Sequence, residues 1–160
     1  MIKFYTNKRK EDDVMELDIV ENKFSIRQII DVIKAKNEHI RKLLTVKDRH
    51  SDAFVYVISG SCTYNFNDNQ EFTVNAGDIF YLAHHANYTM YIHSDEYQFI
   101  FCDFEFENHD LKKSNIYAPS NASYAENTFR KLLYIYTHHT SISFFECMSI
   151  LYDIYGIIAL

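Results

Sequence analysis

The sequence predicts a mainly-β domain, a sandwich or small barrel, followed by a hairpin of two α-helices. The 160 residues include 13 Tyr and 13 Phe but only 3 Gly and 1 Pro, and aromatic residues favour strands. Short apolar runs recur between residues 53 and 106, with turn residues at intervals of about ten residues, as in sandwiches and barrels. Beyond Pro119 the apolar residues follow a helical period instead.

The start of the chain contains one run that fits either a strand or a helix. Residues 1–25 are polar and without a regular apolar pattern, so we expect a flexible N-terminal segment or arm. The β-branched residues of Ile26–Lys36 favour a strand, although its isoleucines also fit one face of a helix. We predict a strand there and a second one over His39–Val46.

The strands that follow are apolar, β-branched runs between polar turns. Asn67-Asp68-Asn69 separates two of the runs. Because Asn and Asp tolerate positive φ, this turn predicts a β-hairpin. The predicted strands are Ala53–Ser59, Ser61–Phe66, Gln70–Val74, Ile79–Leu82, Tyr88–His93 and Tyr97–Phe106.

Two helices are predicted after the strands. In Glu126–His138, apolar residues are spaced i, i+3, i+4 and i+7, and a second helical pattern begins at Ser143. The second helix is apolar on more than one side, whereas a helix packed on one sheet needs a single stripe. Either a second subunit or a missing domain covers the excess, or the helix lies deep between the barrel and the first helix. We favour dimerisation, through Phe144, Met148, Leu151, Tyr155 and Ile158.

Charge and composition restrict the function classes. The net charge of −6 argues against nucleic-acid binding by this chain, because phosphate contacts need clustered Lys and Arg. No signal peptide opens the sequence and no apolar run reaches the ~20 residues of a membrane span, so we expect a cytoplasmic protein without membrane contacts. The three cysteines form no CxxC motif, and we expect buried, reduced thiols at Cys62, Cys102 and Cys147.

The sequence lacks the usual motifs for catalysis and metal binding. The eight His include the adjacent pairs His84-His85 and His138-His139, but no His-x-His and no pair four residues apart, so metal ligands would not converge. Three glycines cannot form a phosphate-binding loop. We therefore expect no metal, no cofactor and no catalytic residues.

Strand parity predicts an aromatic-lined pocket inside the barrel. Alternate residues of a strand share a face, so Val55 faces inward together with Ala53 and Val57. Such a surface, apolar with a few polar groups, is typical of a small-ligand pocket, although the same residues also serve to fill a small barrel. The candidate binding residues are Arg49, Val55, Tyr88, Met90, Phe99, Phe101 and Asp103.

The order of motifs from Arg49 to Phe106 resembles the N-terminal domain of AraC-family transcription regulators. An arginine precedes an apolar strand that ends in Ser-Gly and then a Tyr-rich strand, RHSDAFVYVISGSCTYNF. A Gly-Asp turn and an apolar strand follow in EFTVNAGDIFYLAHHANYTM, and YQFIFCDFEF ends the series. The resemblance covers roughly residues 26–160. It implies a cupin-like double-stranded β-helix, or jelly-roll barrel, that senses a small effector, two dimerisation helices and a separate DNA-binding helix-turn-helix domain.

The sequence differs from the metal-binding cupins at the positions of their metal ligands. Those proteins carry two His and a Glu before the first glycine turn and a further His after the second. Here Ala53 holds the Glu position and Tyr88 holds the last His position, so the resemblance implies a metal-free barrel. It also places Arg49, Phe101 and Asp103 where family members contact effectors.

The predicted organisation is an arm over residues 1–25, an effector-binding barrel over 26–116 and a helical dimerisation region over 117–160, with the DNA-binding domain absent from this chain. We expect a homodimer that binds a sugar or other small metabolite, contacts DNA only through the missing domain and is not an enzyme. One alternative is a free-standing cupin enzyme, such as a sugar isomerase or dioxygenase. Another is a fully packed barrel that only dimerises.

Overall fold

The computed structural model describes residues 25–37, 43–107, 113–138 and 142–159. The predicted arm, and the part of the predicted strand from His39 to residue 42, lie outside these residues. The elements within them are β1 (Ile26–Asn37), β2 (Leu43–Val46), β3 (Asp52–Ser59), β4 (Ser61–Phe66), β5 (Glu71–Asn75), β6 (Ile79–Leu82), β7 (Tyr88–Ile92), β8 (Tyr97–Phe106), β9 (Asn115–Tyr117), α1 (Ala122–Thr137) and α2 (Ser143–Ala159).

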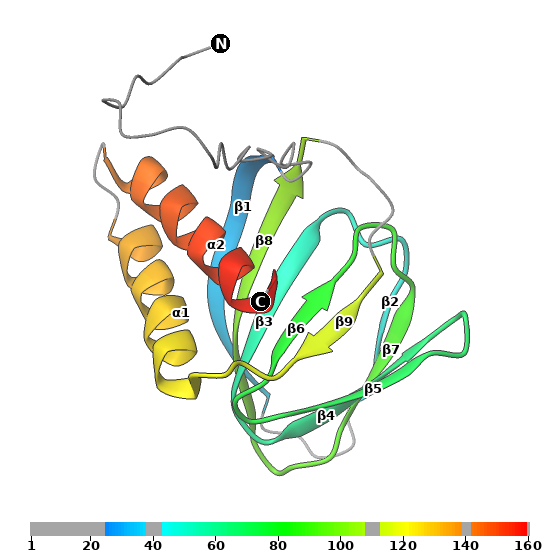
Figure 1. Cartoon of the computed structure of the whole chain (residues 1–160). Helices are drawn as coiled ribbons and strands as arrows, with labels where there is room; N and C mark the ends of the chain where they lie inside the picture. The colour runs from blue at the N-terminus through cyan, green and yellow to red at the C-terminus, as the bar shows by residue number, and fades with distance from the viewer. Residues whose placement is uncertain (1–24, 38–42, 108–112, 139–141, 160) are drawn as a thin grey trace, which may run out of the picture.

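The strands form two antiparallel sheets that face each other (Figure 1). The orders are β1-β8-β3-β6-β9 and β2-β7-β4-β5, so the chain passes repeatedly from one sheet to the other. Four strands of each sheet thereby interleave in the order of a jelly roll. The predicted fold class, a jelly-roll barrel followed by two helices, is confirmed.

Strand β9 is the element that the sequence did not predict. It adds three residues, Asn115–Tyr117, to the edge of the first sheet beside β6. Three residues are too few for a period-2 pattern to be recognised. The barrel consequently extends to Tyr117, one residue past its predicted end.

The ambiguous first run is a strand along its whole length. Residues Ile26 to Asn37 pair with β8, and the register is irregular between Ile26 and Gln28 and again between Ile29 and Asp31. Such irregularities break the strict alternation of side chains, which is why the isoleucine spacing also fitted a helix. Two tyrosine hydroxyls anchor the helices to this strand: Tyr152 accepts from the Ile26 N–H at 2.9 Å, and Tyr136 donates to the Ile30 carbonyl at 3.0 Å.

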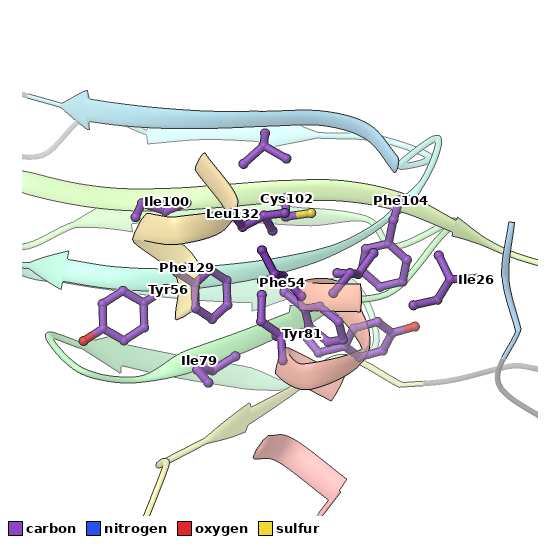
Figure 2. Packing of buried hydrophobic residues seen from close by; sticks show 14 of the residues in the cluster. Ile26, Phe54, Tyr56, Ile79, Tyr81, Ile100, Cys102, Phe104, Phe129 and Leu132 are labelled. Carbon is purple, nitrogen blue, oxygen red and sulfur yellow. The ribbon is translucent and has the colours of Figure 1, made fainter. Parts of the chain in front are cut away.

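The protein has one core inside the barrel and another between the first sheet and the helices. Successive residues of β3 serve both, because Phe54 and Tyr56 belong to the outer core and Val55 and Val57 to the inner one. Figure 2 shows Tyr56 beside Phe129 of α1, and the two rings stack with centroids 5.3 Å apart. A strand buried on both faces reads as a continuous apolar run, as β3 does.

Helix α1 begins at Ala122, four residues before the predicted Glu126, because Asn121 caps it by accepting from the Tyr124 N–H at 3.0 Å. Phe129 and Leu132 of α1 are fully buried against the first sheet. No helix in the described ranges is long and apolar enough to cross a membrane.

The position of α2 corrects part of the predicted dimerisation surface. Leu151 is fully buried in the chain's own outer core, so a partner cannot reach it. Met148, Tyr155 and Ile158 are partly buried against the same core. Of the five predicted residues only Phe144 is exposed, because most of the apolar surface of α2 faces its own barrel.

Candidate functional site

A pocket of about 210 Å³ opens inside the barrel. Its wall is formed by side chains of six strands and by Arg49, which lies in the loop before β3. Most of the wall is apolar, and the polar groups are the Arg49 guanidinium and the hydroxyls of Tyr64 and Tyr88. The lining residues are Ile33, Ala35, Arg49, Val55, Tyr64, Leu82, Tyr88, Met90, Phe99 and Phe101.

The structure brings the predicted binding residues together. Six of the seven line this pocket, and the seventh, Asp103, contacts Arg49 beside it. Sequence reasoning missed Ile33 and Ala35 on β1, Tyr64 on β4 and Leu82 on β6. Strand parity applied to β1 and β4, as it was to β3, would have found the first three.

Aromatic packing fills the rest of the barrel interior. Phe80 lies 4.6 Å from Tyr64 and 5.5 Å from Phe72, measured between ring centroids, and Phe66 lies 5.7 Å from Phe72. The hydroxyls of Tyr64 and Tyr97 are 3.4 Å apart. Aromatic side chains therefore fill the interior on the side of β4 and β5, whereas Ile33 of β1, which lines the pocket, is 43% exposed.

The loop that carries Arg49 is fixed by backbone hydrogen bonds to a neighbouring loop. The Arg49 N–H donates to the Ala86 carbonyl at 3.1 Å, and the His85 N–H donates to the Arg49 carbonyl at 2.8 Å. From this fixed backbone the Arg49 side chain extends into the barrel interior, and Arg49 is only 8% exposed. An arginine buried to this extent needs partners.

Three groups surround the Arg49 guanidinium. Its Nη2 forms an ion pair with Asp103 Oδ1, and its Nη1 donates to the Tyr88 hydroxyl at 3.3 Å. The ring of Phe101 lies below it, 4.8 Å from Cζ to the ring centroid, a cation–π geometry. These contacts hold the planar guanidinium in one orientation at the edge of the pocket.

Asp103 completes the pair from the neighbouring strand β8. Its Oδ1 also accepts a hydrogen bond from the Ser51 hydroxyl at 2.7 Å. Burial raises the pKa of Asp103 above its ordinary value, and the opposing effects of Arg49 and Ser51 only partly offset it. Arg49 is thus what keeps this carboxylate charged inside the barrel.

One donor of Arg49 remains without an acceptor. Its Nε is buried and has no hydrogen-bond partner among the residues that the structure describes. A buried donor left unpaired costs about 1–3 kcal/mol. Arg49 borders the pocket, but this Nε is covered by protein atoms, so a bound molecule can supply the missing acceptor only by moving the Arg49 side chain.

Ala53 and Tyr88, which the resemblance places at two of the ligand positions of metal-binding cupins, are both buried in the inner core. Within the described part of the chain, no three His, Cys, Asp or Glu side chains come together as a metal site requires. Cys62, Cys102 and Cys147 are free and buried, as predicted. Burial raises the pKa of Cys62 to about 12, so its thiol is protonated.

Comparisons with known proteins show the fold. No protein-family model matches the sequence, and no curated protein matches it either. ToxT from Vibrio cholerae strain SCE256 with bound unsaturated fatty acid is similar with a TM-score of 0.53, at 11% identity, over 79% of this chain and 53% of that chain. ToxT from Vibrio cholerae O395 bound to (E)-4-(8-methylnaphthalen-1-yl)but-3-enoic acid has a TM-score of 0.52, at 8% identity, over 67% and 48%. The chain spans about half the length of these ToxT chains.

Proposed function

We propose that this chain is the effector-binding and dimerisation domain of an AraC-type transcription regulator. The observation that carries the proposal is the apolar pocket in the barrel, with a buried arginine at its edge that has one donor left unpaired. A site that is apolar except for a few fixed polar groups suits recognition of a small molecule. The chain acts in this role by binding and not as an enzyme.

The chemistry of the pocket favours a compact, mostly apolar effector with a neutral acceptor such as a carbonyl oxygen. Asp103 already balances the charge of Arg49, so a carboxylate would have to compete with it for the guanidinium. A sugar would place hydroxyls against Val55, Met90 and Phe99, where they find no partners. Among the small metabolites predicted as effectors, we therefore favour mostly apolar ones.

The fold comparisons support the regulatory part of the proposal. ToxT is a regulator of the AraC family, and both ToxT structures contain a bound organic acid. In the proposed regulator this chain supplies the effector-binding half, and a separate domain makes the contact with DNA.

A route from the pocket to the helices is supported by Ser51, which directly precedes β3, and by Asp52, the first residue of β3. Ser51 donates to Asp103 inside the barrel. Asp52 accepts from the Tyr81 hydroxyl at 2.5 Å, and Tyr81 belongs to the outer core with α2. An effector that repositions Arg49 and Asp103 can therefore bias the helices, provided that it binds one arrangement more tightly than the other.

Dimerisation in this proposal uses the first turn of α2. Ile142, Phe144 and Phe145 are 62%, 53% and 72% exposed, and the two phenylalanine rings lie 5.5 Å apart. Exposed apolar patches of this kind mark interaction sites. In a two-fold symmetric dimer with its axis beside this patch, the patch of one subunit would contact the same patch of the other.

Replacing Phe145 with Glu is expected to shift the chain from dimer to monomer, because a charge in a self-matched apolar contact is repelled by its copy. Sedimentation velocity over a concentration series measures the shift. Tyr134→Glu is the matched control, since Tyr134 is 64% exposed on α1 and lies outside the patch. Equal behaviour of the two variants would contradict the predicted surface.

Effector binding is tested by thermal shifts with a panel of small cyclic ketones, amides and alcohols and the carboxylates that match them in shape. A ligand at about 100 times its Kd stabilises a protein by roughly 2.7 kcal/mol. We expect saturable shifts with the neutral compounds, and the part of each shift that Ala35→Phe removes should be larger for the neutral compounds than for the carboxylates, because this substitution fills the pocket from β1. Ala122→Phe on the exposed start of α1 should leave the shifts unchanged. Shifts of the neutral compounds that persist in Ala35→Phe would contradict the proposed function.

A further inference from the structure

A second hollow, of about 250 Å³, lies on the outside of the barrel. It opens between the first sheet and the C-terminal half of α2. Its floor is aromatic and is formed by Phe54, Tyr81 and Phe106, one from each of three adjacent strands. Figure 2 shows Phe54 and Tyr81 side by side, and their ring centroids are 5.8 Å apart. None of these residues lines the pocket inside the barrel.

The hollow exists because the helices cover the sheet unevenly. Phe129 of α1 and Leu151 of α2 are fully buried in the outer core. The hollow itself is lined from α2 by Tyr155 and Ile158, both half-buried, and from the short strand β9 by Tyr117. The hollow is therefore an open, mostly apolar depression, which suits the apolar part of a small molecule.

The charge of the lining is positive at the rim. Lys113 borders the hollow, is exposed and has no ion-pair partner among the described residues. The nearby carboxylate, Asp52, is already occupied, since it accepts hydrogen bonds from the Tyr81 hydroxyl at 2.5 Å and from the His84 N–H at 3.2 Å. An anion at the rim would therefore meet the ammonium of Lys113, while the carboxylate of Asp52 is held by its own hydrogen bonds.

We infer that the outer hollow is a second ligand site, for a small organic acid with an aromatic or branched apolar body. The apolar body lies on the rings of Phe54, Tyr81 and Phe106, and the carboxylate faces Lys113. The volume is just below the roughly 300 Å³ at which drug-sized pockets begin, which corresponds to a ligand with a single ring.

Occupation of this site would join α2 to the barrel. One wall belongs to α2 through Tyr155 and Ile158, and the floor belongs to the sheet. A bound acid would hold the last turns of the helix against β9 and β6. The inference does not depend on the proposed function, because the two pockets share no residue.

The probe for this site is 3-phenylpropionate, compared with the neutral 3-phenylpropanol by calorimetry on the 160-residue chain. We expect saturable binding of the acid at least about tenfold tighter than that of the alcohol, since a charge-assisted contact distinguishes them. Lys113→Gln should weaken the acid about tenfold and leave the alcohol unchanged. Lys131→Gln, an exposed lysine on α1, is the matched control.

Lys113 also borders a polar depression beside His84 and Asn87, so a second variant is needed to locate the acid. Ile158→Trp fills the outer hollow and should abolish binding, with folding checked by its thermal transition. Loss of binding in Ala35→Phe instead would place the acid in the barrel and overturn the inference. No saturable binding, or equal effects of Lys113→Gln and Lys131→Gln, would overturn it as well.

Discussion

Replacing Arg49 with Leu is expected to lower the free energy of unfolding by about 3–5 kcal/mol at neutral pH. The substitution leaves Asp103 charged, largely buried and without its ion-pair partner, and removing one partner of a buried pair has effects of this size. For a chain of this length the loss corresponds to a decrease in Tm of roughly 10 °C. Urea denaturation measures it directly.

The loss should depend on pH in a defined direction. Burial already raises the pKa of Asp103, and Arg49 is the largest opposing influence. Without Arg49 the folded-state pKa rises further above the unfolded value, so the carboxyl favours folding only while it is protonated. This contribution is lost as the pH rises through the folded-state pKa. The deficit of Arg49→Leu is therefore smallest below about pH 4 and largest at neutral pH.

The double variant Arg49→Leu with Asp103→Asn separates charge from packing. It contains no unpaired charge, and the amide oxygen that replaces the carboxylate can still accept from the Ser51 hydroxyl, which Asp103 binds in the native chain. We expect it to recover more than half of the lost stability. A deficit that is independent of pH and unchanged in the double variant would show that Arg49 acts through packing alone.

Gly60→Ala is expected to destabilise the barrel by about 2–5 kcal/mol. Gly60 has a φ of +81° in the turn between β3 and β4, and an added Cβ would overlap the Glu96 carbonyl and the Ser94 hydroxyl. Left-handed backbone strain contributes about 1–2 kcal/mol, and overpacking about 1–3 kcal/mol. Both groups lie in the turn between β7 and β8. The Ser94 hydroxyl can rotate away, but the Glu96 carbonyl is backbone and can move only if the start of β8 shifts.

Gly77→Ala is the matched control for the turn. Gly77 has a φ of +94°, but an added Cβ would meet no atom within 4 Å. Only the backbone strain of about 1–2 kcal/mol remains. Urea unfolding of both variants should give the larger loss at Gly60, and equal losses would contradict the close approach of the two turns.

The strands of the barrel could be predicted from the sequence because each strand is marked by its own apolar run and by the polar turns beside it. Polar turns separate runs such as β4 and β5, and alternate residues of β3 read correctly as inward and outward. The candidate binding residues on strands β3, β7 and β8 followed from the same alternation. Arg49 and Asp103 are 54 positions apart. Their proximity was predicted only from the family resemblance and from the rule that a buried charge needs a partner.

Strand β9, the orientation of α2 and the outer hollow depend on contacts between distant parts of the chain, which a local sequence pattern does not predict. Strand β9 has three residues and exists because β6 offers it an edge. Helix α2 reads as apolar on more than one side, yet Leu151 faces the chain's own core and Phe145, which was not among the predicted residues, is exposed. The outer hollow likewise results from how far α2 extends over the sheet, which the sequence does not encode locally.

The side-chain N–H resonance of Arg49 offers the most direct test of the claim that the barrel binds an effector. Its Nε is the donor left without a partner, and its signal is assigned by its absence from the spectrum of Arg49→Lys. On saturation with the tightest neutral compound of the panel, we predict a downfield shift of the Arg49 Nε proton, because an effector that repositions the Arg49 side chain brings this donor to an acceptor. An Arg49 signal that stays unchanged at saturation would contradict the account.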